Sequence, residues 1–263
     1  MQSSPPSVQI LDPVVANQIA AGEVVTRPAS VVKELVENAI DAGATRIDVT
    51  IAAGGTERIV VADDGHGMAP SDLRLAIERH ATSKIRLADD LLGIGTLGFR
   101  GEALPSIASV SRFAIRTRIA GESTGTELCV EGGEVLGTSP IGCAPGTTVE
   151  VADLFYNVPA RRKFLRALST ESAHVTAAVR NAALANPRIR VTLTRDGRRA
   201  KQWLRVDDWA ERVRQVLGLD RAARCEGERG PVAIAALVGL PDAARAGASA
   251  LHLFVNDRPV QDR

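Results

Sequence analysis

The stretch Glu34-Leu-Val-Glu-Asn-Ala-Ile-Asp-Ala-Gly-Ala44 is the most informative for the fold, because it predicts a helix with one apolar face and one polar face. With the residues before it, it predicts a helix over 29–42, with Pro28 in the first turn and Gly43 as the stop. The apolar residues of this helix recur at helical spacing and form one stripe. They are Val31, Val32, Leu35, Val36, Ala39 and Ile40.

Another face of the same helix carries Glu34, Asn38 and Asp41, at positions i, i+4 and i+7. Asn is a poor helix former, so its presence there favours a function. A Glu and an Asn one turn apart present oxygen ligands that can hold a water molecule and a hard cation. A solvated helix face explains the same pattern, so both interpretations stay open.

Strand and helix patterns continue outward from this helix. Alternating or β-branched stretches predict strands, and 3.6-residue patterns predict helices. The predicted strands are 46–51, 57–62, 112–119, 126–131, 147–151, 188–194, 231–240 and 250–255, and the predicted helices are 71–80, 102–109, 171–185 and one capped by Asp207 or Asp208. Residues 81–101 predict a long loop, which inside a compact domain usually has a function.

The chain has 263 residues, which allows one large domain or two unequal ones. The order of elements changes after the basic stretch Arg195–Arg205. We therefore predict one α/β domain over 1–205 and a smaller helix-plus-strand unit over 206–263.

Composition excludes several classes of protein. Lys and Arg number 32 and Asp and Glu 31, and 45% of residues are hydrophobic, so neither a disordered chain nor a polycation is expected. Aromatic residues make up 3%, too few for a base-stacking platform. No apolar run approaches the roughly 20 residues of a membrane span. The three cysteines and four histidines have no metal-ligand spacing.

Two further segments carry chemistry. Asp63-Asp64-Gly65-His66-Gly67 follows a predicted strand, and a carboxylate there can accept a hydrogen bond from an exocyclic amine such as that of adenine. Lys84 and the glycines of 93–101 precede a predicted helix, an arrangement that favours an anion such as phosphate. An acidic turn and a flexible surface loop are the alternatives.

Two nucleotide-binding motifs are rejected. Gly93-x-Gly95-x-x-Gly98 has the dinucleotide spacing, but no apolar strand precedes it. A Walker A loop needs a Gly-Lys pair, and the sequence has none.

The helix at 34–44, the Asp63-x-Gly-x-Gly67 turn, the Gly98-Phe-Arg-Gly-Glu-Ala-Leu104 loop and Gly146-Thr147 come in the order of the ATP-binding motifs of the GHKL superfamily. Within that group the chain resembles the MutL family of DNA mismatch repair proteins. The supporting stretches are Ile19-Ala-Ala-Gly-Glu-Val-Val25, Arg79-His-Ala-Thr-Ser-Lys84 and Leu154-Phe-Tyr-Asn-Val-Pro-Ala-Arg-Arg-Lys-Phe-Leu165. Asp64 stands where the family often has Asn.

The resemblance implies a Bergerat-type α/β sandwich with a mixed sheet, followed by the start of a transducer domain similar to ribosomal protein S5. It implies ATP and Mg²⁺ as ligands. Glu34 would be the general base, Asn38 would hold Mg²⁺, and Asp63 would bind the adenine amino group, with Gly67 and Thr147 beside it. The lid would include Thr82, Ser83 and Lys84, and the phosphate loop would include Gly98, Arg100, Gly101, Glu102, Ala103 and Leu104.

The family's activity would be slow, Mg²⁺-dependent ATP hydrolysis that drives conformational switching and homodimerisation in the bacterial cytoplasm. The implied partners are a MutS-type mismatch-recognition protein and DNA, the latter bound largely without sequence preference through Arg258 and Arg263. The alternative is a nucleotide-gated binding module without significant hydrolysis. The family's distal γ-phosphate lysine and C-terminal dimerisation region have no counterpart here, so we expect a fragment.

Overall fold

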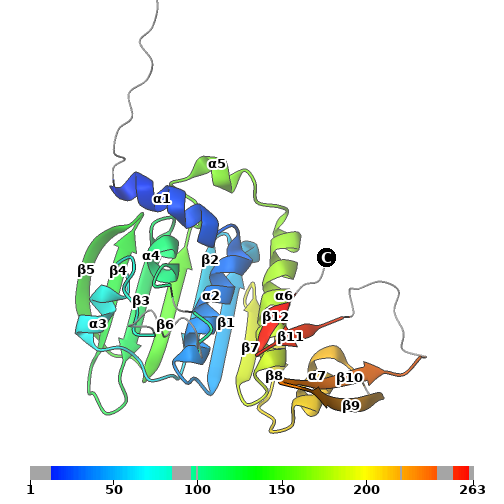
Figure 1. The fold of residues 1–263 in the computed structure, drawn as a ribbon. Helices are drawn as coiled ribbons and strands as arrows, with labels where there is room; N and C mark the ends of the chain where they lie inside the picture. The colour runs from blue at the N-terminus through cyan, green and yellow to red at the C-terminus, as the bar shows by residue number, and fades with distance from the viewer. Residues whose placement is uncertain (1–12, 85–95, 99, 220, 242–250, 261–263) are drawn as a thin grey trace, which may run out of the picture.

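The computed structural model describes residues 13–84, 96–98, 100–219, 221–241 and 251–260 (Figure 1). One sheet organises most of them. Its strands are β1 (Arg46–Ala52), β2 (Arg58–Asp63), β3 (Arg112–Arg118), β4 (Gly125–Glu131), β5 (Glu134–Ile141), β6 (Gly146–Ala152), β7 (Arg190–Arg195) and β8 (Arg198–Trp203). Their order is β5-β4-β3-β6-β2-β1-β7-β8, and all neighbours are antiparallel except the β1–β7 pair. The predicted mixed sheet is confirmed.

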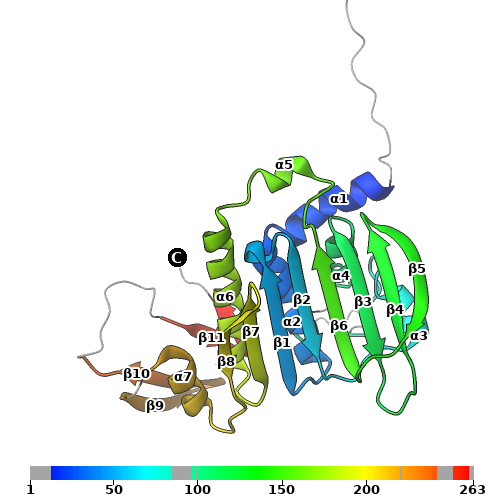
Figure 2. The ribbon, with the colours of Figure 1, turned by 180° about the vertical axis from the view of Figure 1, so that it is seen from behind.

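The helices lie on one face of this sheet (Figure 1), and the view from behind shows the strands uncovered (Figure 2). They are α1 (Pro13–Val24), α2 (Pro28–Asp41), α3 (Pro70–Leu75), α4 (Ala103–Ala108), α5 (Pro159–Arg162) and α6 (Leu168–Ala185), with a short 3₁₀ turn, η1 (Ala53–Gly55). α2 and α6 pack side by side, and α1 lies against α4.

The core lies between the helices and the sheet. Strand β1 shows the expected alternation, with Ile47, Val49 and Ile51 at most 1% exposed. The apolar stripe of α2 packs into the same cluster, together with Val175 and Val179 of α6. This burial is the main driving force that fixes α2, and its polar face, against the sheet.

The uncovered face of the sheet is stabilised by paired charges across its strands. Arg58 and Arg116 both bond to Glu150, at 2.7 and 3.3 Å, and Arg116 also bonds to Glu127 at 2.7 Å. Such cross-strand pairs suit a sheet face that meets solvent.

Several elements differ from the sequence prediction. The helix expected over 71–80 ends at Leu75. Strands β5, β8, β9 and β12 and helices α1 and α5 were not predicted. β5 and β8 are edge strands rich in exposed residues, so they lack the hydrophobic alternation from which a strand is inferred.

Beyond β8 the chain forms α7 (Trp209–Leu217), the hairpin β9 (Ala222–Arg229) and β10 (Val232–Gly239), and the hairpin β11 (Leu253–Val255) and β12 (Arg258–Val260). Asp208 caps α7 as predicted, because its carboxylate accepts from Ala210 N at 3.2 Å. We propose a domain boundary near residue 205, where the sheet ends.

Candidate functional site: a polar helix face and an aspartate turn

The polar face of α2 lies where several segments meet. Asp41, in its last turn, has a side chain that is 6% exposed and accepts three hydrogen bonds. They come from Lys84 Nζ at 2.5 Å, Leu97 N at 2.9 Å and Gly98 N at 3.1 Å. Asp41 therefore binds both an earlier residue and two later residues of the loop that was predicted over 81–101. The sequence analysis put Asp41 on this face but gave it no role.

Asn38, one turn earlier, shares Lys84 with Asp41. Its Oδ1 accepts from Lys84 Nζ at 2.9 Å. A Cβ added to Gly98 would lie 3.3 Å from Lys84 Nζ and 3.7 Å from Asn38 Oδ1, so the backbone of Gly98 closes this cluster. The predicted site residues Asn38, Lys84 and Gly98 are thus brought together.

Glu34 extends the same face by another turn. Its side chain is 26% exposed and lies 3.3 Å from Lys33 Nζ, which also bonds to Glu37. Burial, outweighing its bond to Lys33, raises the pKa of Glu37. Glu34 is the more exposed carboxylate of the two, at 26% against 17% for Glu37, so it is the more accessible to water.

Asp63 lies at the end of β2, beside the C-terminus of α2. The turn after it packs on that helix, because His66 N donates to Ala42 O at 3.0 Å. Asp63 Oδ1 accepts from Gly65 N at 2.8 Å and Thr147 N at 3.3 Å. No described residue donates to Oδ2. Burial raises the pKa of Asp63 against these two hydrogen bonds.

Asp64, the next residue, has a different role. Its carboxylate accepts from Thr45 N, Thr45 Oγ1 and Arg46 N at 2.7–2.8 Å. Burial acts to raise the pKa of Asp64, but these bonds together outweigh it and lower the pKa. Asp64 therefore fastens the turn to the start of β1, and an Asn could accept the same two backbone hydrogen bonds.

The remaining loop residues pack around one glycine. Gly101 has φ +61, and a Cβ there would lie 2.4 Å from Ala81 O. His80 N donates to Gly101 O at 3.1 Å. Glu102 precedes α4 and lies 3.7 Å from Arg79 and 3.8 Å from His80. The two sides of the loop are thus joined at its base.

The other predicted loop residues take several environments. Thr82 Oγ1 accepts from Lys84 N at 3.1 Å. Ser83 and Arg100 are exposed, whereas Leu104 is half-buried and packs on the core after Ala103. The described residues thus tie Thr82 directly to Lys84, and they leave Ser83 and Arg100 at the surface.

Comparison with known proteins gives this arrangement a family. A family model described as "Histidine kinase-, DNA gyrase B-, and HSP90-like ATPase" matches residues 26–132. The chain is 34% identical to the Aquifex aeolicus MutL ATPase domain complexed with ADP, with a TM-score of 0.75 over 91% of this chain and 85% of that one. The chain belongs to the MutL family. It carries the GHKL ATPase fold that the sequence predicted.

Full-length MutL proteins agree with this assignment. The DNA mismatch repair protein MutL of Anaeromyxobacter sp. (strain K) is 50% identical over 98% of this chain and 43% of its own length. MutL of Xylella fastidiosa (strain M23) is 50% identical over 97% of this chain and 42% of its own. The chain therefore spans about two fifths of the length of these relatives.

In this MutL chain, Gly67 is required by packing. Its φ is +71, and a Cβ would lie 2.3 Å from Arg118 O. Gly146 is similar, with φ +111 and a Cβ 2.1 Å from Asp63 O. Thr147, beside it, contacts Thr117 through their hydroxyl oxygens at 3.1 Å. These close approaches hold the strand ends around Asp63.

The basic residues predicted to contact DNA fall in different places. Arg258, at the start of β12, donates to Thr96 O at 2.8 Å and so reaches the loop. Arg263 lies outside the described residues. A further basic stretch at α5, not among the predicted DNA contacts, is divided: Arg161 donates to Ile19 O and packs beneath Gly22, whereas Arg162 and Lys163 are exposed.

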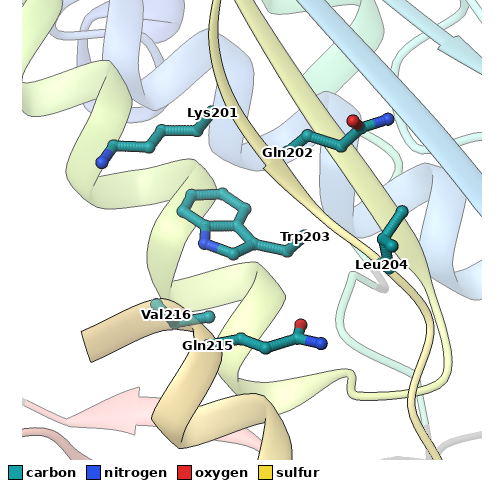
Figure 3. Close-up of a pocket in the computed structure, with 6 residues that line it drawn as sticks. All are labelled: Lys201, Gln202, Trp203, Leu204, Gln215 and Val216. Atoms are coloured by element: carbon teal, nitrogen blue, oxygen red, sulfur yellow. The ribbon is translucent and has the colours of Figure 1, made fainter. Parts of the chain in front are cut away.

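No group of three or more His, Cys, Asp or Glu in the described ranges could hold a metal ion. None of the helices in the described part of the chain has the length and apolar character needed to cross a membrane. Among the same residues, a cavity of about 370 Å³ lies between β8 and α7 and has none of the predicted site residues in its lining (Figure 3).

Proposed function

We propose that this domain binds ATP with Mg²⁺ and hydrolyses it slowly during DNA mismatch repair. The observation that supports this most is the convergence on one helix end of Asp63, the Glu34–Asn38 face and the loop residues Lys84 and Gly98. The contacts of Asp41 bring Lys84 and Gly98 to this helix end. The related Aquifex aeolicus domain has been solved in complex with ADP, which supports nucleotide binding by this domain.

Asp63 suits the recognition of adenine. Oδ1 is held by two backbone N–H groups, and this fixes the carboxylate while Oδ2 accepts nothing from the described residues. An exocyclic amino group can donate to Oδ2. Phosphate groups would then lie toward Gly98, Gly101 and Lys84, where backbone N–H groups and an ammonium can neutralise their charge.

The donor set fits Mg²⁺ bound jointly with a nucleotide. Protein-only coordination is not available in the described residues, but Mg²⁺ in nucleotide sites takes one or two protein oxygens and completes its shell with phosphates and water. Asn38 Oδ1 already accepts from a cation, the Lys84 ammonium, and is therefore the oxygen that would hold the metal. When bound, Mg²⁺ supplies charge neutralisation at the phosphates.

Glu34 would orient and deprotonate the attacking water, as a general base within reach of the phosphates. Lys33 Nζ lies 3.3 Å from its carboxylate. Catalysis of phosphoryl transfer depends mostly on such positioning and charge neutralisation. The expected switching, homodimerisation, cytoplasmic location and binding of DNA and a MutS-type partner are part of this proposal.

A pair of isosteric variants tests it. Glu34→Gln should bind ATP with Mg²⁺ as tightly as the parent in calorimetry but release phosphate about 10²–10⁴-fold more slowly. Glu37→Gln, on the same helix, should release phosphate at the parent's rate. Binding by the parent without release in any variant would support the nucleotide-gated module instead. No binding by the parent would refute the nucleotide site.

A further inference from the structure

Strand β8 forms an open edge of the sheet. It pairs with β7 on one side, and no other described strand lies along its outer side. The remaining backbone hydrogen bonds of the described residues do not reach Arg198–Trp203 either. The outer N–H and C=O groups of β8 are therefore available, and an available strand edge is a template for one more strand.

This edge is positively charged. Arg198, Arg199, Lys201 and Arg205 are exposed, and none of them forms an ion pair within the described residues. The arginines inside the sheet behave differently, since Arg58 and Arg116 are both paired with carboxylates. Arg199 pairs with Thr194 and Lys201 with Leu193, so their side chains lie on opposite faces of the edge strand.

A cavity of mixed polar and apolar lining adjoins the charged edge. It measures about 370 Å³ and is lined by Lys201, Gln202, Trp203, Leu204, Gln215 and Val216. Figure 3 shows the Trp203 indole between β8 and the end of α7. Trp203 is 5% exposed and forms a wall, whereas Leu204 is 57% exposed and lies open to a ligand.

The cavity is held in shape by a buried arginine. Arg212 lies one turn before Gln215 on α7 and is fully buried. It donates to Pro187 O, Ile189 O and Leu204 O at 2.6, 2.7 and 3.0 Å. These bonds fasten α7 to the end of the β7–β8 pair where β7 begins and β8 ends, so the cavity needs little rearrangement to accept a side chain.

We propose that the outer edge of β8 binds an extended acidic segment of a partner protein, which pairs with β8 as an additional strand. Acidic side chains of the segment meet Arg199 and Lys201, and one bulky apolar side chain enters the cavity between Trp203 and Val216. Main-chain hydrogen bonds would give the affinity, and the charges and the cavity would give the selectivity.

The charge and shape of the edge favour this partner over two others. A second copy of the chain would bring the same cations against one another, which is unfavourable. A nucleic acid would meet the positive charge, but it would leave the outer main-chain N–H and C=O groups of β8 without a strand partner. An acidic peptide uses all three features: the strand edge, the cations and the cavity.

The probe is a fluorescein-labelled peptide of about ten residues, the length of a long strand, with alternating Glu and Val and one central Leu. Fluorescence anisotropy should show binding with a Kd of about 10–100 μM. The same peptide with N-methylated backbone amides should bind at least about tenfold more weakly, because it cannot pair as a strand.

Protein variants locate the site. Arg199→Glu with Lys201→Glu should weaken peptide binding about tenfold or more, whereas Arg162→Glu with Lys163→Glu, an equal charge change elsewhere, should change it less than about twofold. The chain has two tryptophans, so ¹⁹F NMR of the fluorotryptophan-labelled protein resolves each. The Trp203 signal should shift with peptide, and the Trp209 signal should not.

Several outcomes would overturn the proposal. They are equal binding of the N-methylated peptide, equal losses in the two charge variants, or an unchanged Trp203 signal at saturation. Binding of oligothymidylate but not peptide would assign the edge to nucleic acid, and self-association lost on Lys201→Glu would assign it to a second copy. Each of these leaves the proposed ATPase site unaffected, because Glu34 and Asp63 are unchanged.

Discussion

Asp63→Asn offers a direct test of how the site recognises its base. The substitution keeps Oδ1, which accepts from Gly65 N at 2.8 Å and Thr147 N at 3.3 Å, so the turn should fold unchanged. It replaces Oδ2, which accepts nothing from the described residues, with an NH₂ group. The adenine amino group would then meet a donor in place of an acceptor.

The expected loss follows from one charge-assisted hydrogen bond. Such a bond is worth about 1.5–3 kcal/mol, so the affinity for ATP should fall about 10- to 150-fold. Calorimetry with Mg²⁺ measures it directly. The matched ligand is a purine nucleoside triphosphate with hydrogen in place of the 6-amino group, whose affinity should differ less than about threefold between the two proteins.

This cycle separates recognition from folding. If both nucleotides lost affinity equally, Asp63 would act through the turn and not through the amino group. An unchanged affinity for ATP in Asp63→Asn would refute the assignment of Asp63 to the base.

Four further predictions concern stability. Burial raises the pKa of Asp63 above its ordinary 3.8, so ionisation of Asp63 lowers the free energy of unfolding at higher pH. In urea unfolding, Asp63→Asn should therefore be more stable than the parent near about pH 7, and this gain should vanish near about pH 3. The lowered pKa of Asp64 gives the opposite sign, so Asp64→Asn should be less stable near about pH 7, with a deficit that shrinks as the pH falls below 3.8. Gly67→Ala should cost about 1–3 kcal/mol more than Gly43→Ala, because the two have φ +71 and +72 but only Gly67 would place a Cβ against backbone; equal losses would contradict this. Arg212→Ala should cost about 3–5 kcal/mol in the same assay, since three carbonyls lose their donor, and a loss below about 1 kcal/mol would show that Arg212 does not fasten α7.

Much of the fold was accessible from local patterns. Helix α2 and strands β1, β3 and β7 each have one buried face and one face toward polar surroundings. Their apolar residues therefore recur about every 3.6 residues in the helix and every 2 in the strands, and this repeat can be recognised in the sequence. Each of these elements was predicted to within two residues. Strands β5 and β8 were missed because edge strands bury little, and their exposed residues show no alternation.

The candidate site divides in the same way. Residue types and their spacing identified Glu34, Asn38 and Asp63, because a helix period aligns the first two and a strand end presents the third. No local pattern indicates that Asp41 binds Lys84 and the backbone of Leu97 and Gly98, since those partners are more than forty residues away.

The sequence by itself therefore determined the family, the fold class and the elements that have a clear local period. Only the tertiary structure decided which of those residues meet. It placed Arg258 on the loop at Thr96, assigned Gly67 to packing on β3, and left β8 as a charged, open edge beside a cavity. The physical reason is that hydrophobic periodicity is a local property of the chain. Hydrogen bonds between distant segments, and the edge at which a sheet stops, depend on how the whole chain packs.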